Sequence, residues 1–482
     1  MRLFLFLMNI LGMEFLMNLQ PQKSKTLNSA LPKLIRLYEH WEHTEEFLEI
    51  EKSLYFRKDN RCSVFQYENI KENNVEKCKI KANYYIGVGT VSNNHHIFVS
   101  PKVNNKLLES IQENLDDIDV DHTAKAKIES KEEVNSLPEV DVVKMLSEII
   151  KLPDATKEIS ELLDIDWDAP EIEVEHLDND YLSPFLVVQF IHLMKKIVKK
   201  GLKKSYYTVE ENLNSRIKGK ILIPKTIKLN HLKNRATNTF CKYQEFGFNS
   251  IENRFLKKVL EFVNNYLSTN KELLSSVNSE IRNSINYISS AFELISPLEN
   301  IKEIKSVKHN KFYKEYKEAI HLGELILKNF SYSITKSNTT ARKKTPPYWI
   351  DMSRLFELYA YKRLLENEAY RKIKYHWKTF GNEVDFIGFY NNPEKGNEIP
   401  IIIDAKYKLH YENSKEHQDM RQVAGYARLK KVYHHFSDKV KNSDIIDCLI
   451  IYPTLNKETE LQISEIKAYQ NIYKMGICLP IK

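Results

Sequence analysis

Glycine is scarce in this 482-residue sequence, and its scarcity excludes two classes of nucleotide-binding protein. Only 12 glycines are present, and the pair Gly87 and Gly89 lacks the third glycine of a dinucleotide-binding loop. The phosphate-binding pattern GxxxxGK(S/T) does not occur anywhere in the chain. We therefore do not expect a P-loop NTPase or a dinucleotide-dependent enzyme.

Cysteines and long apolar runs are also few. The five cysteines form no CxxC pair, so neither a zinc ribbon nor a disulfide framework is expected; they are Cys62, Cys78, Cys241, Cys448 and Cys478. Residues 1–17 are mostly apolar and superficially resemble a signal peptide. Asn9 and Glu14 interrupt the run, however, and the small-x-small cleavage site of a signal peptide does not follow. This run is too short for a membrane span, and no other approaches 18 residues. We expect a soluble, cytoplasmic protein, and leave open whether residues 1–20 belong to the mature chain.

The charge of the chain is divided between an acidic segment and a basic body. The net charge is +7, yet residues 109–180 contain 23 Asp and Glu against 6 Lys. Residues 181–350 contain 30 Lys and Arg against 13 Asp and Glu, which suggests nucleic acid as the first candidate partner. Residues 161–180 contain nine acids, and a run of this kind is most often a solvated loop or face. A docking surface for a basic partner is the more specific alternative.

The pattern of residues predicts a multidomain α+β protein. The spacing of Leu34, Leu37 and Trp41 is helix-like, residues 80–103 predict two strands around the turn at residues 92–94, and residues 142–150 predict a helix. Residues 181–330 are predicted to be mainly helical, with a short strand at 221–227. A break at Thr345-Pro346-Pro347 follows. We divide the chain into an apolar leader (1–30), an N-terminal β-containing acidic region (31–180), a basic, largely helical middle region (181–340) and a C-terminal α/β domain (341–482).

The C-terminal domain is predicted to contain a helix, a hairpin, a second helix and a further strand, arranged around a mixed sheet. Asp351 can cap the first helix. The sequences NEVDFIGFY and IPIIIDAKYK form the predicted hairpin. KEHQDMRQVAGYARL follows as a helix and DIIDCLIIYP as a buried strand.

Charged residues in this hairpin form a candidate metal site. Asp404 and Lys406 lie two apart, so a strand places both on one face. A register that brings Asp385 beside Asp404 would join two carboxylates and one ammonium. Two carboxylates suit Mg²⁺, and the lysine can then assist attack of water on a phosphodiester.

The spacing alone has little specificity. Decoys with the same spacing occur at Glu129, Glu303, Glu315 and Glu465, and a surface hairpin with an ordinary ion pair is the plain alternative. Two features add weight to the site. Gln422 and Tyr426 lie four apart on the following helix, and Glu357 on the preceding helix could add a carboxylate. The plain alternative for Gln422 is a surface amide, that for Tyr426 is packing in the core, and that for Glu357 is a solvent-facing acid.

These residues resemble the PD-(D/E)xK nuclease superfamily through Val384-Asp385, Asp404-Ala405-Lys406 and the Gln422-xxx-Tyr426 helix. The sequence is similar in particular to the McrC-type nuclease subunit of McrBC and LlaJI-like 5-methylcytosine restriction systems. That likeness rests on PPYWIDMSRLFELYAYKRL, IIIDAKYK, QDMRQVAGYA, RIKGKILIPKTI, FCKYQEFGFNSIENRFLKK and YYIGVGTV, and spans roughly residues 80–455. Val384 stands where the superfamily motif has proline.

The resemblance implies a restriction-endonuclease-like C-terminal domain that cuts double-stranded, methylated DNA with Mg²⁺. It implies an McrB-like AAA+ GTPase hexamer as partner, which binds the GTP and is engaged and stimulated by the N-terminal region. The implied catalytic residues are Asp385, Asp404 and Lys406, with Gln422 and Glu357, and the implied metal ligands are Asp385 and Asp404. Two rivals remain: a standalone DNA-repair nuclease, and a non-cleaving DNA-binding adaptor that regulates an NTPase.

Overall fold

The computed structural model describes residues 33–39, 42–46, 63–72, 75–92, 95–103, 137–152, 155–174, 181–269, 280–300, 303–304, 313–334, 343–379, 381–391, 398–408, 416–441, 444–458, 460–466 and 469–482. The leader at 1–30 and the acidic residues 104–136 lie outside these ranges, so the predictions for them stay predictions. The described residues form a mixed α/β protein with several sheets, which agrees with the predicted combination of helices and strands.

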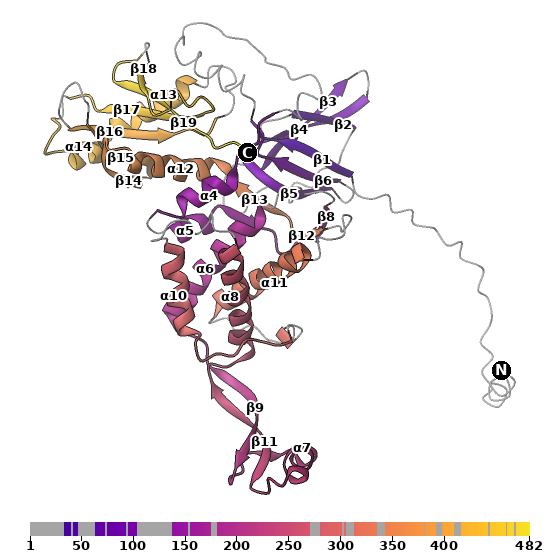
Figure 1. The fold of residues 1–482 in the computed structure, drawn as a ribbon. Coiled ribbons are helices and arrows are strands. Elements are labelled where there is room, and N and C mark those ends of the chain that lie inside the picture. Colours follow the sequence, from indigo (N-terminus) through magenta and orange to yellow (C-terminus); the bar gives the residue numbers. More distant parts are fainter. Residues whose placement is uncertain are drawn as a thin grey trace, which may run out of the picture.

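Two sheets form the N-terminal part of the molecule (Figure 1). One has the order β2-β4-β3, with β2 at Glu42–Glu46, β4 at Val75–Ala82 and β3 at Phe65–Glu72. The other has the order β1-β6-β5-β13-β7, with bounds Lys33–Tyr38, His95–Ser100, Tyr85–Ser92, Tyr348–Asp351 and Leu163–Ile165. The hairpin predicted within residues 80–103 is confirmed as β5 and β6.

The helix predicted from residue 31 onward is wrong, because β1 and β2 occupy its start. Ile35 and Leu37 are buried and Arg36 between them is exposed, which is the alternation of a strand. Gly87 also has a structural role. A Cβ there would lie 2.1 Å from the carbonyl oxygen of Tyr348, so the glycine permits β13 to pair with β5.

Helices form the middle of the molecule. They are α6 (Leu182–Lys200), α8 (Ile251–Thr269), α10 (Glu280–Ala291) and α11 (Lys314–Ile334), with the shorter α4 (Val142–Ile149) and α5 (Ala155–Ser160) beside them. The predicted helix at 142–150 and the predicted end of α6 at Gly201 are confirmed. Among the described helices, none is both long and apolar enough to cross a membrane.

A hairpin arm extends from this helical body (Figure 1). Strands β9 (Ser205–Asn214) and β11 (Asn238–Gly247) pair along their whole length, and β10 (Lys220–Ile221) extends their sheet. The tip carries α7 (Ile223–Leu229) and a 3₁₀ turn, η2 (His231–Lys233). The strand predicted at 221–227 is therefore wrong after Ile221, because Pro224 lies in the first turn of α7, where a helix tolerates it.

A six-stranded mixed sheet organises the C-terminal part. Its order is β14-β15-β16-β17-β19-β18, with bounds Tyr370–Thr379, Asn382–Asn391, Glu398–Ala405, Asp447–Thr454, Ile472–Cys478 and Ile463–Glu465. Its helices are α12 (Met352–Glu366), α13 (Glu416–Ala427) and α14 (Lys430–His435). Strands β16, β17 and β19 are parallel, whereas β14, β15 and β16 are antiparallel. The predicted hairpin, helices, mixed sheet and Asp351 cap are confirmed, and β14 is an addition.

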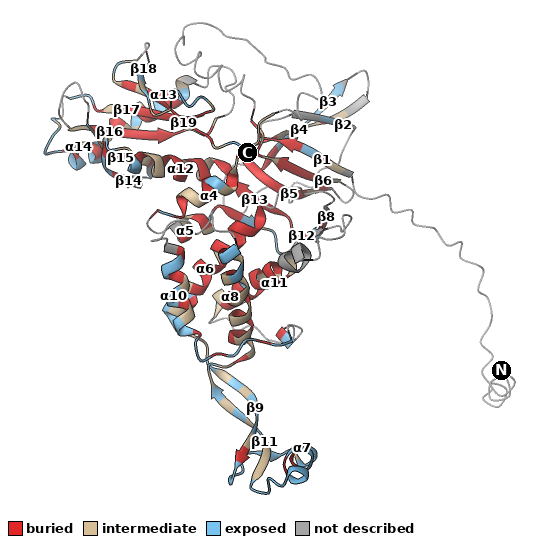
Figure 2. Cartoon of the chain, in the orientation of Figure 1, coloured by how far each residue is buried: buried red, intermediate tan, exposed pale blue. Residues whose placement is uncertain are grey.

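The chain after residue 340 also contributes to the N-terminal region. Strand β12 (Lys343–Thr345) pairs with β8 (Ile172–Val174), and β13 pairs with β5 and β7. The acidic segment is partly neutralised within the chain as well, because Glu158 pairs with Arg354 and Glu171 with Lys328. Much of the interior is buried in one continuous core that includes both the helices and the C-terminal sheet (Figure 2).

A buried hydrogen bond joins the N-terminal sheet to the end of β16. Tyr407 Oη donates to Glu39 Oε2 at 3.0 Å, and Glu39 Oε1 has no hydrogen-bond partner. Burial raises the pKa of Glu39 to about 8, the hydrogen bond from Tyr407 opposes this rise, and the charge of Asp351 adds to it. The folded protein therefore holds a proton on Glu39 over much of the pH range in which the unfolded chain has lost it.

Glu39→Gln is expected to reduce the pH dependence of stability. Because the pKa of Glu39 is higher in the folded protein, the wild type loses stability as pH rises from about 4 to about 8. Glutamine keeps an acceptor for Tyr407 without a titrating proton. Denaturant unfolding should show the variant roughly 2–4 kcal/mol more stable at pH 9 and nearly equal at pH 5. Equal differences at both pH values would contradict a buried, protonated Glu39.

Candidate active site

The pairing of β15 with β16 places two aspartates together. Phe386 is opposite Ile403, and the same register one residue further along brings Asp385 opposite Asp404. Asp385 Oδ2 accepts a hydrogen bond of 2.8 Å from the backbone N–H of Ala405. This side-chain contact fixes the Asp385 carboxylate against the end of β16.

Lys406 lies between a buried carboxylate and the following helix. Its Nζ is 2.8 Å from Asp404 Oδ2, and Asp404 is only 1% exposed. Lys406 Nζ also donates to Gln422 Oε1 at 3.0 Å, and Gln422 Nε2 donates to Tyr426 Oη at 2.7 Å. The one-turn spacing on α13 therefore produces a chain of contacts that holds the ammonium beside Asp404.

Helices on opposite faces of the sheet meet at this strand end. Phe386 stacks on Tyr361 of α12, with ring centroids 5.9 Å apart, whereas the thiol of Cys448 contacts the Val423 carbonyl of α13. Phe386 pairs with Ile403 of β16 and Cys448 pairs with its neighbour Ile402. Because neighbouring residues of a strand face opposite sides, these contacts place α12 and α13 on different faces of the sheet. Gln422 thus reaches the site from one side, and Glu357 on α12 comes from the other.

Glu357 belongs to the same electrostatic environment as the two aspartates. Its charge helps to raise the pKa of both Asp385 and Asp404. Its Oε2 lies 3.3 Å from Nε2 of His376 on β14, and Nδ1 of His376 lies 3.4 Å from Glu383 Oε1. His376 is absent from the sequence prediction, because the strand that carries it was not predicted.

Burial dominates the electrostatics of the site. Desolvation raises the pKa of Asp385 well above its usual value, and the charges of Asp404 and Glu357 raise it further. Desolvation also raises the pKa of Asp404, although Lys406 opposes this shift. For Lys406, burial alone would lower the pKa, but the neighbouring Asp404 makes the net shift upward. Carboxylates held together in this way favour a bound cation.

The donor set fits a hard divalent ion with few protein ligands. Asp404 Oδ2 is buried and has the ionic contact with Lys406 but no aligned hydrogen-bond donor. Across the described ranges, no three His, Cys, Asp or Glu side chains converge as a full set of metal ligands. Mg²⁺ retains several waters and needs only one or two carboxylates, so Asp385 and Asp404 are sufficient for it.

A second ion pair, also missed from the sequence, borders the site. Lys408 pairs with Asp419 on α13, and the charge of Asp419 contributes to the raised pKa of Asp404. Asp419 lies three residues before Gln422, so helical periodicity places both on one face. That spacing in QDMRQVAGYA is a signal that could have identified Asp419 from the sequence.

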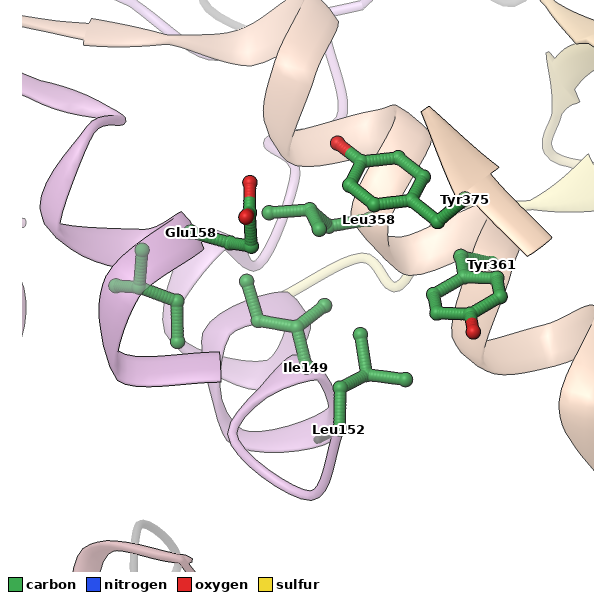
Figure 3. A pocket seen from close by; sticks show the side chains of 7 residues that line it. Ile149, Leu152, Glu158, Leu358, Tyr361 and Tyr375 are labelled. Carbon is green, nitrogen blue, oxygen red and sulfur yellow. The ribbon is translucent and has the colours of Figure 1, made fainter. Parts of the chain in front are cut away.

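The structure also contains an apolar pocket, at the contact of α4 and α5 with α12 and β14 (Figure 3). It is lined by Ile149, Leu152, Glu158, Ile159, Leu358, Tyr361 and Tyr375. Glu158 is the only acid in this lining and is already paired with Arg354. The pocket therefore lacks the convergent polar groups found at the end of β16, which remains the candidate active site.

Asp385→Asn is expected to stabilise the metal-free protein. Because the pKa of Asp385 is raised in the folded protein, ionised Asp385 costs stability at any pH above the pKa of an aspartate in the unfolded chain, about 4. Asparagine can still accept from Ala405 N–H and removes the charge. Denaturant unfolding at pH 7.5 with a chelator should show a gain of about 1–2 kcal/mol, and Asp438→Asn, at an exposed position, should show none. A loss of stability in Asp385→Asn would contradict this view of the site.

Comparison with known proteins identifies the family. The family model described as "McrBC 5-methylcytosine restriction system component" matches residues 80–436. A chain of the Thermococcus gammatolerans assembly of McrB AAA+ hexamers with bound McrC is 15% identical, covering 92% of this chain and 94% of that chain, with a TM-score of 0.33. A chain of the Thermococcus gammatolerans McrBC complex is 16% identical, covering 70% and 89%, with a TM-score of 0.25.

The search of curated proteins returned no match. The assignment therefore rests on the family model, which covers more than half of the 482 residues. The chain belongs to the family of McrBC 5-methylcytosine restriction system components.

Proposed function

We propose that this chain is the McrC-like nuclease subunit of a restriction system and hydrolyses DNA phosphodiesters with Mg²⁺ at a PD-(D/E)xK site. The observation that carries the proposal is the convergence of Asp385, Asp404 and Lys406 at one strand end, with Gln422 holding the lysine. The β14-β15-β16 antiparallel unit, joined by a parallel β17 and flanked by α12 and α13, provides the scaffold.

In the proposed mechanism, Asp385 and Asp404 would hold Mg²⁺, and Glu357, whose charge acts on both aspartates, would be a further acidic group at the site. When bound, the metal activates water and stabilises negative charge on the scissile phosphate. Ala405 N–H orients Asp385, and burial keeps Asp404 in one position. Lys406 directs its ammonium toward the reacting groups and stabilises the charge that develops there, while Gln422 and Tyr426 limit its freedom.

We propose double-stranded, methylated DNA as the substrate, in keeping with the family to which the chain belongs. The basic surplus of residues 181–350 supports a polyanion partner, since lysines and arginines bind phosphates irrespective of sequence. Recognition of the modified base is assigned to the partner, because the described site contains groups for phosphate chemistry and metal binding.

We propose an McrB-like AAA+ GTPase hexamer as the partner, and place its docking surface on the arm at residues 205–247 rather than on residues 31–180, which the resemblance alone implies. One solved assembly that includes a chain similar to this one contains McrB AAA+ hexamers. Of the fifteen large hydrophobic side chains exposed in the described residues, eight lie on the arm. The arm projects from the helical body and much of it is exposed (Figure 2). Exposed apolar side chains that gather on such an arm are typical of a protein-binding surface.

Reconstitution tests the proposed function. The full chain, an McrB-like GTPase, GTP and methylated DNA should give cleavage that requires Mg²⁺ and stops when a chelator is added. Cleavage of equal rate without the GTPase would favour the standalone repair nuclease. Stimulated GTP hydrolysis without cleavage of any methylated or unmethylated DNA would favour the non-cleaving adaptor.

A further inference from the structure

His376 lies in a row of polar residues that crosses three strands. In the pairing of β14 with β15, Tyr375 is opposite Phe386 and Trp377 is opposite Val384. This register places His376 across from Asp385, which in turn lies across from Asp404. The histidine therefore belongs by position to the edge at which the proposed metal ligands gather.

The backbone of His376 is in an unfavourable conformation. Its φ is +50°, in the left-handed region that favours glycine and that residues with a Cβ seldom adopt. Lys372, on the same strand, has a φ of +52°, but it lies within a register shift between Arg371 and Lys374 and so serves a bulge. The pairing on either side of His376 continues without a shift, so no extra residue accounts for its conformation.

The contacts of His376 show what the conformation achieves. The imidazole lies between two carboxylates, with Nε2 3.3 Å from Glu357 Oε2 and Nδ1 3.4 Å from Glu383 Oε1. The ring also stacks on Tyr375, with centroids 3.7 Å apart. Tyr375 is anchored by the rings of Tyr361 and Phe386, so the imidazole is held on a rigid support.

We propose that His376 is a positioning residue that holds the Glu357 carboxylate toward Asp385 and Asp404. The inference rests on the proposed metal-dependent function. An ordinary ion pair on a strand requires no left-handed backbone, whereas a ligand that must be fixed in place accounts for one. Partners of this kind commonly change metal affinity by about 10- to 100-fold when they are removed.

His376→Gly separates positioning from folding, because glycine adopts the left-handed backbone more readily than histidine. The variant should unfold at the same or a higher temperature than the wild type in a chelator. Titration of the full chain with Mn²⁺ should show roughly tenfold weaker binding. Lys372→Gly is the matched control, since it relieves the same backbone conformation outside the site and should bind Mn²⁺ as the wild type does.

A double-mutant cycle tests whether His376 acts through Glu357. Glu357→Ala alone should weaken Mn²⁺ binding, and His376→Gly added to it should change the affinity by less than about twofold. Undiminished affinity in the His376→Gly single variant, or a full additional loss in the double variant, would overturn the inference. If the wild type binds no Mn²⁺ at all, both the proposed function and the inference about His376 fail. If the wild type binds Mn²⁺ but the variants do not behave as expected, only the inference about His376 fails.

Discussion

Asp404→Asn is expected to slow DNA cleavage about a thousandfold while leaving stimulation of the partner's GTPase intact. Asparagine has nearly the same shape as aspartate but lacks the negative charge of this proposed metal ligand, which is 1% exposed and therefore shielded from solvent. Loss of a ligand and of its charge should cost about 4 kcal/mol of transition-state stabilisation, which corresponds to this factor. Single-turnover cleavage of methylated DNA by the reconstituted complex measures the effect, and GTP hydrolysis is measured in the same samples.

Lys406→Met provides a second variant at the same centre. It retains an unbranched chain but removes the ammonium that lies 2.8 Å from Asp404. Glu315→Gln is the matched control, because Glu315 and Lys317 repeat the Asp404 and Lys406 spacing on helix α11. Cleavage should be lost in Lys406→Met and preserved in Glu315→Gln. If Asp404→Asn and Lys406→Met both cut as fast as the wild type, the reacting centre lies elsewhere.

The C-terminal part was the most predictable from the sequence, because its signals agree with one another. IPIIIDAKYK is an apolar run that ends in charges, and a buried strand that ends at Ala405 beside the candidate site gives this pattern. Asp351 is followed by a helix and caps it, as its side chain accepts from Arg354 N–H. Local propensity, hydrophobic pattern and capping thus favoured the same elements, which is where prediction succeeds.

The errors occur where local pattern and tertiary pairing disagree. Leu34 and Leu37 fit one face of a helix, but β1 is stabilised by parallel pairing with β6, more than 60 residues away in sequence. ILIPKTI contains β-branched residues typical of a strand, yet α7 begins at Ile223 and has Pro224 in its first turn. A short apolar window carries no information on which distant segment will pair with it, so such assignments depend on contacts that the sequence does not reveal.

Only part of the candidate site could be predicted from the sequence, for the same reason. Asp385, Asp404, Lys406 and Gln422 were predicted as a group, because two neighbouring strands and one helix carry them, and the structure brings these four together. Their roles stay predictions. The contact of Glu357 with His376 depends on the left-handed backbone of β14, and Glu39 reaches Tyr407 from the other end of the chain. Neither contact corresponds to a recognisable spacing of residues in the sequence.

The second large effect is expected at the arm, where Leu232→Glu and Ile223→Glu should each weaken binding to the AAA+ partner at least about a hundredfold. Leu232 is 75% exposed and Ile223 is 62% exposed, so a charge at either position leaves the fold of the arm intact. In a complex, an apolar contact of this kind is buried, and a glutamate there would lose its hydration without gaining a partner. Binding of the full chain to the GTPase, measured by surface plasmon resonance, gives the change in Kd.

Charge on the arm makes this interpretation specific. Residues 205–247 contain eight Lys and Arg against three Glu, and two of those glutamates, Glu210 and Glu245, are paired with arm lysines. The arm therefore keeps a net positive charge, and a partner surface complementary to it would be acidic. An acidic surface would repel an introduced glutamate, so repulsion should add to the cost of desolvation. Leu294→Glu is the matched control, because Leu294 is 94% exposed after helix α10 and outside the arm. An equal loss of binding in Leu294→Glu, or normal binding by both arm variants, would place the docking surface elsewhere. A loss of binding in the arm variants alone, accompanied by loss of cleavage and of GTPase stimulation, would establish the arm as the contact through which the motor controls the nuclease.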